Sequence, residues 1–244
     1  MDGPKTFVLV HGAWHAGWGW GAVANRLMAA GHQVHAPTMA GHGLGESRLG
    51  VRHQDGVDSL VDYVESRDLH DVVLVAHSWG GFMVTAATPR LASRIDRLVY
   101  WNAFVPLEGE TMLGLNPGSV ADLYAASAAA STDNSVELDW EVWRSGLIQT
   151  APEDVARTIF DLLGTEPYSS FTEPVDLGDF YELRIPASFI NGTEDLTMPE
   201  GEYHWLERHA PRLGSPRLLE LPIDHEALFL QPAALADVIL TAAE

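Results

Sequence analysis

The chain has 244 residues, of which 46% are hydrophobic, so it can bury a substantial core in one large domain. Its 34 acidic and 14 basic residues give a formal net charge of −20, which argues against binding to nucleic acid or to an anionic membrane. There is no cysteine, which excludes disulfides and thiolate chemistry. No apolar run has the length of a membrane span and the N-terminal stretch has no signal-peptide pattern, so we expect a cytoplasmic protein.

Short apolar, β-branched runs alternate with segments of helical periodicity through the first 105 residues. We expect strands at 6–10, 33–37, 71–77 and 95–104, and helices at 20–32, 55–69 and 80–91. The glycine-rich stretch 38–47 reads as a loop. This alternation predicts an α/β fold with a mostly parallel, doubly wound sheet covered by helices on both faces.

The alternation stops after residue 105 and resumes near residue 184. Between them the sequence predicts helices at 119–131, 139–148 and 152–164, with no convincing strand. Afterwards we expect strands at 186–192 and 216–222 and helices at 200–210 and 232–243. The predicted organisation is a core of residues 1–105 and 184–244 with a helical lid, residues 106–183, although a purely structural insertion is the alternative.

The stretch VVLVAHSWGGFMVTAA, residues 72–87, places a serine between a strong strand and a strong helix. The sequence Ala76-His77-Ser78-Trp79-Gly80 matches a small-x-Ser-x-Gly turn, in which residues two positions from the serine must be small. The amides at the start of the following helix favour a negative charge near the serine. We therefore interpret Ser78 as a nucleophile rather than an ordinary turn residue.

A serine nucleophile needs a base and a carboxylate that orients the base. His225 lies between the last strand and the last helix, where open α/β sheets place their sites, whereas His204 and His209 lie in a predicted helix. Asp195 follows the preceding strand and is the predicted acid, with Glu194 as the alternative. The order serine, acid, histidine is the one that this fold requires.

The remaining predicted site residues surround this triad. The backbone amides of Ala13 and Trp79 are the predicted oxyanion hole. Gly12, which allows the backbone to approach closely, is a predicted substrate-binding residue. The predicted substrate-binding aromatics are Trp101, Phe104, Trp143 and Phe171, each of which has a plain core role as its alternative. His11 and His15 lie in a loop and not on a helix, so we expect no metal site, and no other cofactor.

The chain resembles the α/β-hydrolase superfamily, and more closely the branch of plant methylesterases, the salicylate-binding esterase and the hydroxynitrile lyases. The resemblance rests on FVLVHGAWHAGWGW, GHG, AHSWGG, FTEPV, GTEDLTMP and DHEALF, and it runs almost the full length. It is weakest across residues 110–165. The lyases of this branch carry a threonine in the first loop and a lysine after the catalytic histidine. Here these positions are Gly12 and Glu226, and a carboxylate there would repel cyanide.

We therefore predict a cofactor-independent carboxylesterase-type hydrolase that cleaves a small, largely apolar ester or lactone through an acyl-enzyme on Ser78. Two alternatives stay open. One is a non-hydrolytic enzyme of the same fold, such as a cyclase, lyase or cofactor-free dioxygenase, with His225 as base. The other is a small-molecule binder. A homodimer is also left open.

Overall fold

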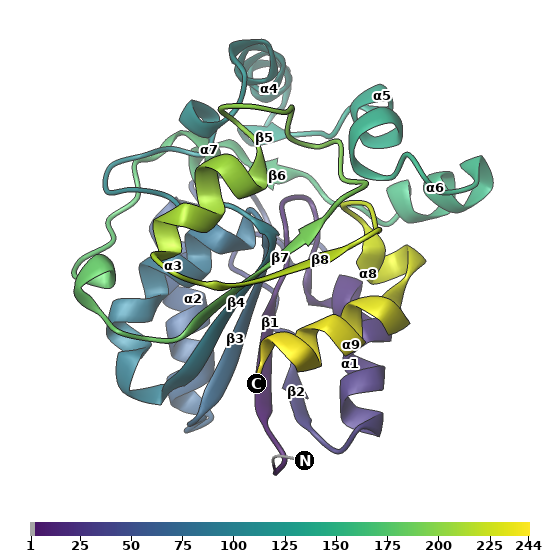
Figure 1. Cartoon of the computed structure of the whole chain (residues 1–244). Helices are drawn as coiled ribbons and strands as arrows, with labels where there is room; N and C mark the ends of the chain where they lie inside the picture. The colour runs from purple at the N-terminus through teal and green to yellow at the C-terminus, as the bar shows by residue number, and fades with distance from the viewer. Residues whose placement is uncertain (1–2) are drawn as a thin grey trace.

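A six-stranded parallel sheet forms the centre of the computed structural model, which describes residues 3–244 (Figure 1). The strands lie in the order β2-β1-β3-β4-β7-β8, and every neighbouring pair is parallel. Their bounds are β1 Thr6–Val10, β2 Gln33–His35, β3 Val72–Ser78, β4 Ile95–Ala103, β7 Ala187–Gly192 and β8 Arg217–Leu221. The predicted α/β fold with a parallel sheet is confirmed.

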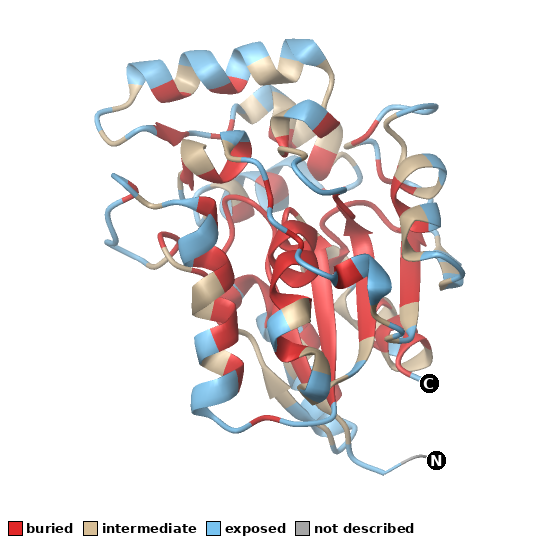
Figure 2. Ribbon diagram, turned by 90° about the vertical axis from the view of Figure 1, so that its left-hand side faces the viewer, coloured by how far each residue is buried: buried red, intermediate tan, exposed pale blue. Residues whose placement is uncertain are grey.

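Helices cover both faces of this sheet. One face carries α1 (Gly21–Ala29) and α9 (Pro232–Ala242), and the other carries α2 (His53–Ser66) and α3 (Gly80–Leu91). The short α8 (Ala227–Leu230) precedes α9. Figure 2 shows the buried residues concentrated on the strands and on the helix surfaces that face them.

Alternating side chains of the strands fill two separate cores. In β1, Phe7 and Leu9 pack under α1 and α9, whereas Val8 and Val10 pack under α2 and α3. Both sets are 0% exposed, which explains why the strand is a continuous apolar run instead of an alternating one. The carboxyl ends of β1, β3, β7 and β8 therefore open onto one edge of a rigid sheet.

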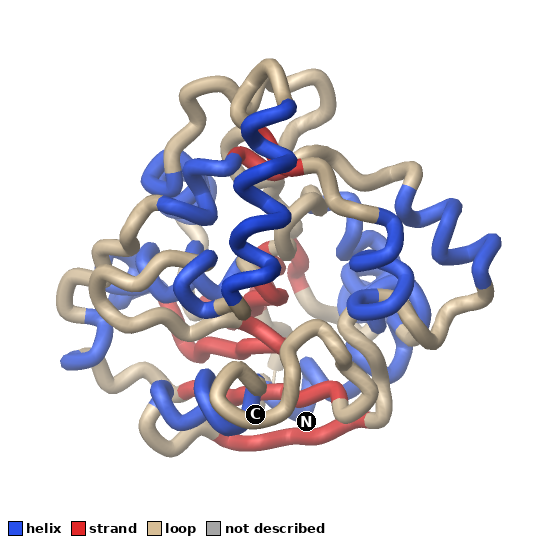
Figure 3. Tube along the Cα trace, turned by 90° about the horizontal axis from the view of Figure 1, so that it is seen from above, coloured by secondary structure: helices blue, strands red, loops and turns tan. Residues whose placement is uncertain are grey.

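The chain between β4 and β7 forms a mostly helical insertion above this edge (Figures 1 and 3). Its helices are α4 Gly118–Ala130, α5 Trp140–Val142, α6 Glu153–Phe160 and α7 Tyr168–Thr172. The expectation of no strand here was wrong, because β5 (Ser135–Val136) and β6 (Glu166–Pro167) form an antiparallel pair. Each is only two residues long, too short to produce a periodic pattern.

The expected helix at 200–210 is also replaced by shorter turns. A π-helical turn covers Trp205–His209 and a 3-10 turn covers Ala210–Leu213. Pro211 lies at the start of the second turn, where its missing N–H prevents a continuous α-helical ladder. Trp205, the first residue of the π-helical turn, is 0% exposed.

Candidate active site

Ser78 ends β3 in a strained turn. Its φ is +53°, a left-handed conformation that costs energy for any residue other than glycine. Helix α3 begins two residues later at Gly80, where an added Cβ would lie 2.6 Å from the His11 carbonyl oxygen. An added Cβ on Gly81 would lie 1.9 Å from the Phe104 carbonyl oxygen. Both glycines are therefore needed for the chain to turn this sharply against its neighbours.

The structure brings His225 and Asp195 together. His225 Nδ1 donates to Asp195 Oδ2 across 2.7 Å, and both side chains are buried. His225 precedes α8 and Asp195 follows β7, so both come from loops at the carboxyl edge of the sheet. Glu194, the alternative acid, is exposed, and its hydrogen bonds to Gln149 and Ile223 use backbone atoms only. Asp195 is thus the carboxylate that contacts the histidine.

The charges of this pair reinforce one another. Burial alone would lower the pKa of His225, but the Asp195 carboxylate raises it above its ordinary value, with smaller contributions from Glu226 and Asp224. Burial alone would raise the pKa of Asp195, but the His225 charge and hydrogen bonds from His225 and Thr197 hold it below its ordinary value. Asp195 therefore stays ionised while His225 becomes a stronger base.

Three further donors hold the Asp195 carboxylate. Trp205 Nε1 donates to Oδ2 across 2.9 Å, Asn102 Nδ2 donates to the same oxygen, and the Thr197 amide donates to Oδ1 across 2.7 Å. The Trp205 ring also stacks on the His225 ring, with centroids 5.9 Å apart. Sequence reasoning missed Asn102 and Trp205. The sequence around these two residues does not indicate a contact with Asp195, because only the tertiary fold brings them to it.

The predicted oxyanion residues flank Ser78. Within residues 3–244, neither the amide of Ala13 nor that of Trp79 donates to a protein acceptor, so both N–H groups are available. An added Cβ on Gly12 would lie 3.1 Å from Ser78 Cβ, which brings this loop against the serine. His15 Nδ1 donates to the Ala13 carbonyl across 2.7 Å and thereby orders the loop.

No hydrogen bond from the Ser78 hydroxyl is found among the described residues. The preceding residue, His77, contacts the histidine directly, and its ring centroid lies 4.6 Å from that of His225. His77 Nε2 donates to the His225 carbonyl across 3.1 Å. Burial, followed by the nearby His225 and His15 charges, holds the pKa of His77 well below its ordinary value, so this ring is neutral.

The predicted aromatic residues divide between the two cores. Phe104, Trp143 and Phe171 belong to the core under α2, α3 and the insertion, and all are at most 2% exposed. Trp101 belongs instead to the core under α1 and α9. That position gives no support to its predicted role in substrate binding, which stays a prediction for all four residues.

One group of side chains in residues 3–244 could offer three metal ligands within 4.8 Å of one another: His77, His225 and Glu226. The group includes the histidine that pairs with Asp195, and His77 already donates to a carbonyl oxygen. Two of the three members, His77 and His225, therefore already hold hydrogen bonds within the protein. The expectation of a metal-free site stays a prediction.

Comparison with known proteins identifies the family. A family model described as "Alpha/beta hydrolase family" matches residues 7–238.

The chain belongs to the alpha/beta hydrolase family. A solved "Extracellular alpha/beta-hydrolase from Paenibacillus species", whose title states homology to "Tobacco Salicylic Acid Binding Protein 2", superimposes with a TM-score of 0.94. Its sequence is 32% identical, and the match covers 98% of this chain and 99% of that one. A carbendazim hydrolyzing esterase of Nocardioides is 35% identical, but the match covers only 64% of each chain. Methylesterase 2 of Arabidopsis thaliana is 26% identical, over 98% of this chain and 96% of its own.

These relatives confirm the resemblance to the plant methylesterase branch, and their names support a carboxylesterase-type hydrolase. The Paenibacillus relative is described as extracellular, so the cytoplasmic location stays a prediction. In the part of the chain that the structure describes, every helix is too short or too polar to cross a membrane.

Proposed function

We propose that this hydrolase cleaves a small, largely apolar carboxylic ester or lactone through an acyl-enzyme on Ser78. The observation that carries the proposal is the buried 2.7 Å contact between His225 and Asp195, at the sheet edge where Ser78 ends its strand in a strained turn. Asn102, Thr197 and Trp205 further orient this carboxylate, as a catalytic pair would require.

In the first half of the reaction, Ser78 Oγ attacks the ester carbonyl carbon while His225 Nε2 takes the hydroxyl proton. Asp195 keeps the proton on Nδ1 and stabilises the imidazolium. The Ala13 and Trp79 amides bind the oxyanion. His225 then gives its proton to the leaving alcohol, which departs and leaves Ser78 acylated.

In the second half, a water molecule attacks the acyl carbon with its oxygen while His225 takes a proton from it. The second tetrahedral intermediate collapses, the proton returns to Ser78, and the carboxylic acid leaves. The reaction consumes one ester and one water and needs no redox cofactor.

The surroundings and the relatives support the proposed substrate class. The insertion contributes the buried aromatic rings of Trp143 and Phe171, which favour an apolar acyl or alcohol group. Several relatives are named methylesterases, which makes methyl esters the first substrates to test. We further propose that residues 106–183 act as a lid over the core formed by 1–105 and 184–244.

The test is hydrolysis of a panel of methyl esters, p-nitrophenyl esters and lactones by the wild type, Ser78→Ala and His225→Ala. Turnover by the wild type, lost in both variants, supports the proposal. A Ser78→Ala protein with full turnover overturns the role of Ser78. A folded wild type that is inert on every ester and lactone overturns the substrate class and favours a non-hydrolytic reaction of this fold.

A further inference from the structure

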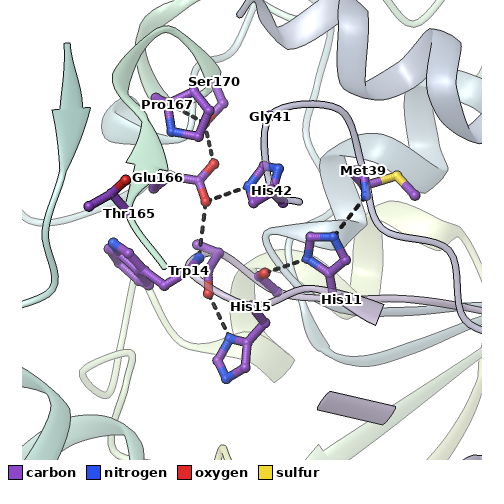
Figure 4. A network of polar contacts seen from close by, with 12 residues as sticks. His11, Trp14, His15, Met39, Gly41, His42, Thr165, Glu166, Pro167 and Ser170 are labelled. Atoms are coloured by element: carbon purple, nitrogen blue, oxygen red, sulfur yellow. Dashed lines mark hydrogen bonds and ion pairs between the residues drawn. The ribbon is translucent and has the colours of Figure 1, made fainter. Parts of the chain in front are cut away.

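A buried carboxylate of the insertion reaches into the loop that carries Ala13. Glu166, in β6, is 0% exposed and lies far from this loop in sequence. Its Oε2 accepts from the Trp14 amide across 3.0 Å and from His42 Nε2 across 2.8 Å (Figure 4). Its Oε1 accepts from Ser170 Oγ across 2.5 Å. Each oxygen thus accepts at least one hydrogen bond, and none of these contacts belongs to the triad.

The partner of Glu166 is placed to carry a positive charge. His42 Nδ1 lies 3.1 Å from the Ala40 carbonyl and Nε2 faces the carboxylate, so both ring nitrogens meet acceptors and the doubly protonated ring fits this site. Burial opposes this charge, but Glu166 raises the pKa of His42 above its ordinary value. Burying a carboxylate and an imidazolium costs free energy because both charges leave water. The close, hydrogen-bonded contact between them offsets this cost.

The pair contacts both sides of the predicted oxyanion hole. Trp14 directly follows Ala13, and the His42 ring lies 4.9 Å from the ring of Trp79. Glu166 therefore holds the peptide on the carboxyl side of Ala13, while His42 packs on the second oxyanion residue. The carboxylate does not itself reach the reacting atoms.

Trp14 needs this restraint because its backbone is strained. Its φ is +61°, a conformation that a bulky residue adopts only when the surroundings enforce it. The insertion supplies all its polar partners: Glu166 for the amide, the Gly164 amide at 2.9 Å for the carbonyl, and the Val136 carbonyl at 3.1 Å for the indole. The oxyanion loop is thus held in its conformation by the insertion above it.

We propose that Glu166, paired with His42, is a positioning residue. Through it, the insertion packed on the core sets the geometry of the oxyanion hole. This inference rests on the proposed function. Glu166 sets the orientation of the Ala13 amide through Trp14, so its loss weakens transition-state binding more than substrate binding.

The chain offers a matched control. Glu173 is also a carboxylate of the insertion that accepts a core backbone amide, that of His53, across 3.1 Å, but it lies at α2 and not at the oxyanion loop. Glu166→Ala and Glu173→Ala both remove one anchor of the insertion. Glu166→Gln keeps an oxygen for the Trp14 amide and removes the charge, which provides a folded variant if Glu166→Ala does not fold.

The experiment measures kcat, KM and inhibition by a trifluoromethyl ketone, which forms an oxyanion when serine adds to it. We expect Glu166→Ala to lower kcat by about 10-fold to 100-fold, with KM changed by less than about threefold. Inhibitor affinity should fall in parallel with kcat/KM, and Glu166→Gln should recover most of the loss. Glu173→Ala should keep kcat within about twofold of the wild type.

Two outcomes overturn the inference while leaving the proposed function intact: equal loss of kcat in Glu166→Ala and Glu173→Ala, or a Glu166→Ala effect confined to KM. If only Glu166→Gln folds, unchanged kcat and inhibitor affinity in His42→Gln overturn it as well. A wild type with neither turnover nor labelling by a fluorophosphonate overturns the proposed function itself.

Discussion

Gly12 and Ser78 are in such close contact that a Cβ atom added to the glycine would lie 3.1 Å from Ser78 Cβ. The same atom would lie 3.0 Å from His77 Nδ1. The absence of a side chain at residue 12 therefore allows the loop that carries Ala13, the proposed oxyanion loop, to pass against the serine.

Gly12→Ala should reduce kcat by about 10-fold to 100-fold, because a displacement of the loop by a fraction of an ångström misplaces the Ala13 amide. Overpacking should also lower the free energy of unfolding by about 1–3 kcal/mol. Gly21→Ala is the control, since an added Cβ there meets nothing within 4 Å. Steady-state kinetics and urea denaturation of both variants check the prediction, which fails if Gly12→Ala keeps the wild-type kcat.

The pH dependence of kcat/KM should depend on Glu226. His225 acts as a base only when neutral, and its pKa is raised first by Asp195 and then by Glu226. Activity is therefore lost as the pH falls through this raised pKa. Glu226→Gln removes one charge that raises it, so the acid limb of the profile should move to lower pH. Glu220→Gln, which changes an exposed residue on β8, should leave the acid limb in place. A shift of the limb to higher pH in Glu226→Gln would contradict the assignment of His225 as the base.

Trp205→Phe should separate stacking from hydrogen bonding. Phenylalanine keeps an aromatic ring against His225 but removes the donor that reaches Asp195 Oδ2. A buried carboxylate that loses one donor should cost about 1.5–3 kcal/mol in the free energy of unfolding. Chemical denaturation measures this cost, with the half-exposed Trp18→Phe as control. Equal stability of the two variants would show that the Trp205 contact contributes nothing.

Stability should fall as the pH drops below about 6.5, the ordinary value for an unfolded histidine. Burial, followed by the Arg212 charge, lowers the pKa of His209 to about 3 in the folded state. Below about pH 6.5 the unfolded chain binds a proton at this histidine that the folded chain does not bind. Each such histidine lowers the free energy of unfolding by up to about 1.4 kcal/mol for every pH unit. His42 and His225, whose pKa values are raised, act in the opposite direction.

His209→Gln should therefore show a shallower loss of unfolding free energy between pH 6 and pH 5 than the wild type. His70→Gln, which changes an exposed histidine, should keep the wild-type slope. Urea denaturation at each pH gives the slopes. Identical slopes for His209→Gln and the wild type would contradict a neutral, buried His209.

The residues that could be predicted from the sequence are those with a local signal. The apolar runs of β1 and β3 identified the central strands. Ser78 ends β3, and Asp195 and His225 follow β7 and β8, in the order that the fold requires, while their catalytic roles stay predictions. Asn102, Trp205 and Glu166 have no such signal. Glu166 lies 152 residues from Trp14 in the sequence, and the two meet only because the insertion packs against the core. The two-residue strand that contains Glu166 is likewise too short to leave a pattern.

The most direct test of the central claim is intact-mass analysis after treatment with a fluorophosphonate, followed by peptide mapping. The proposed mechanism predicts one covalent adduct on the peptide that contains Ser78. It also predicts no adduct in Ser78→Ala and strongly slowed labelling in His225→Ala. An adduct on another residue, or equal labelling of the wild type and Ser78→Ala, would show that Ser78 is not the activated nucleophile.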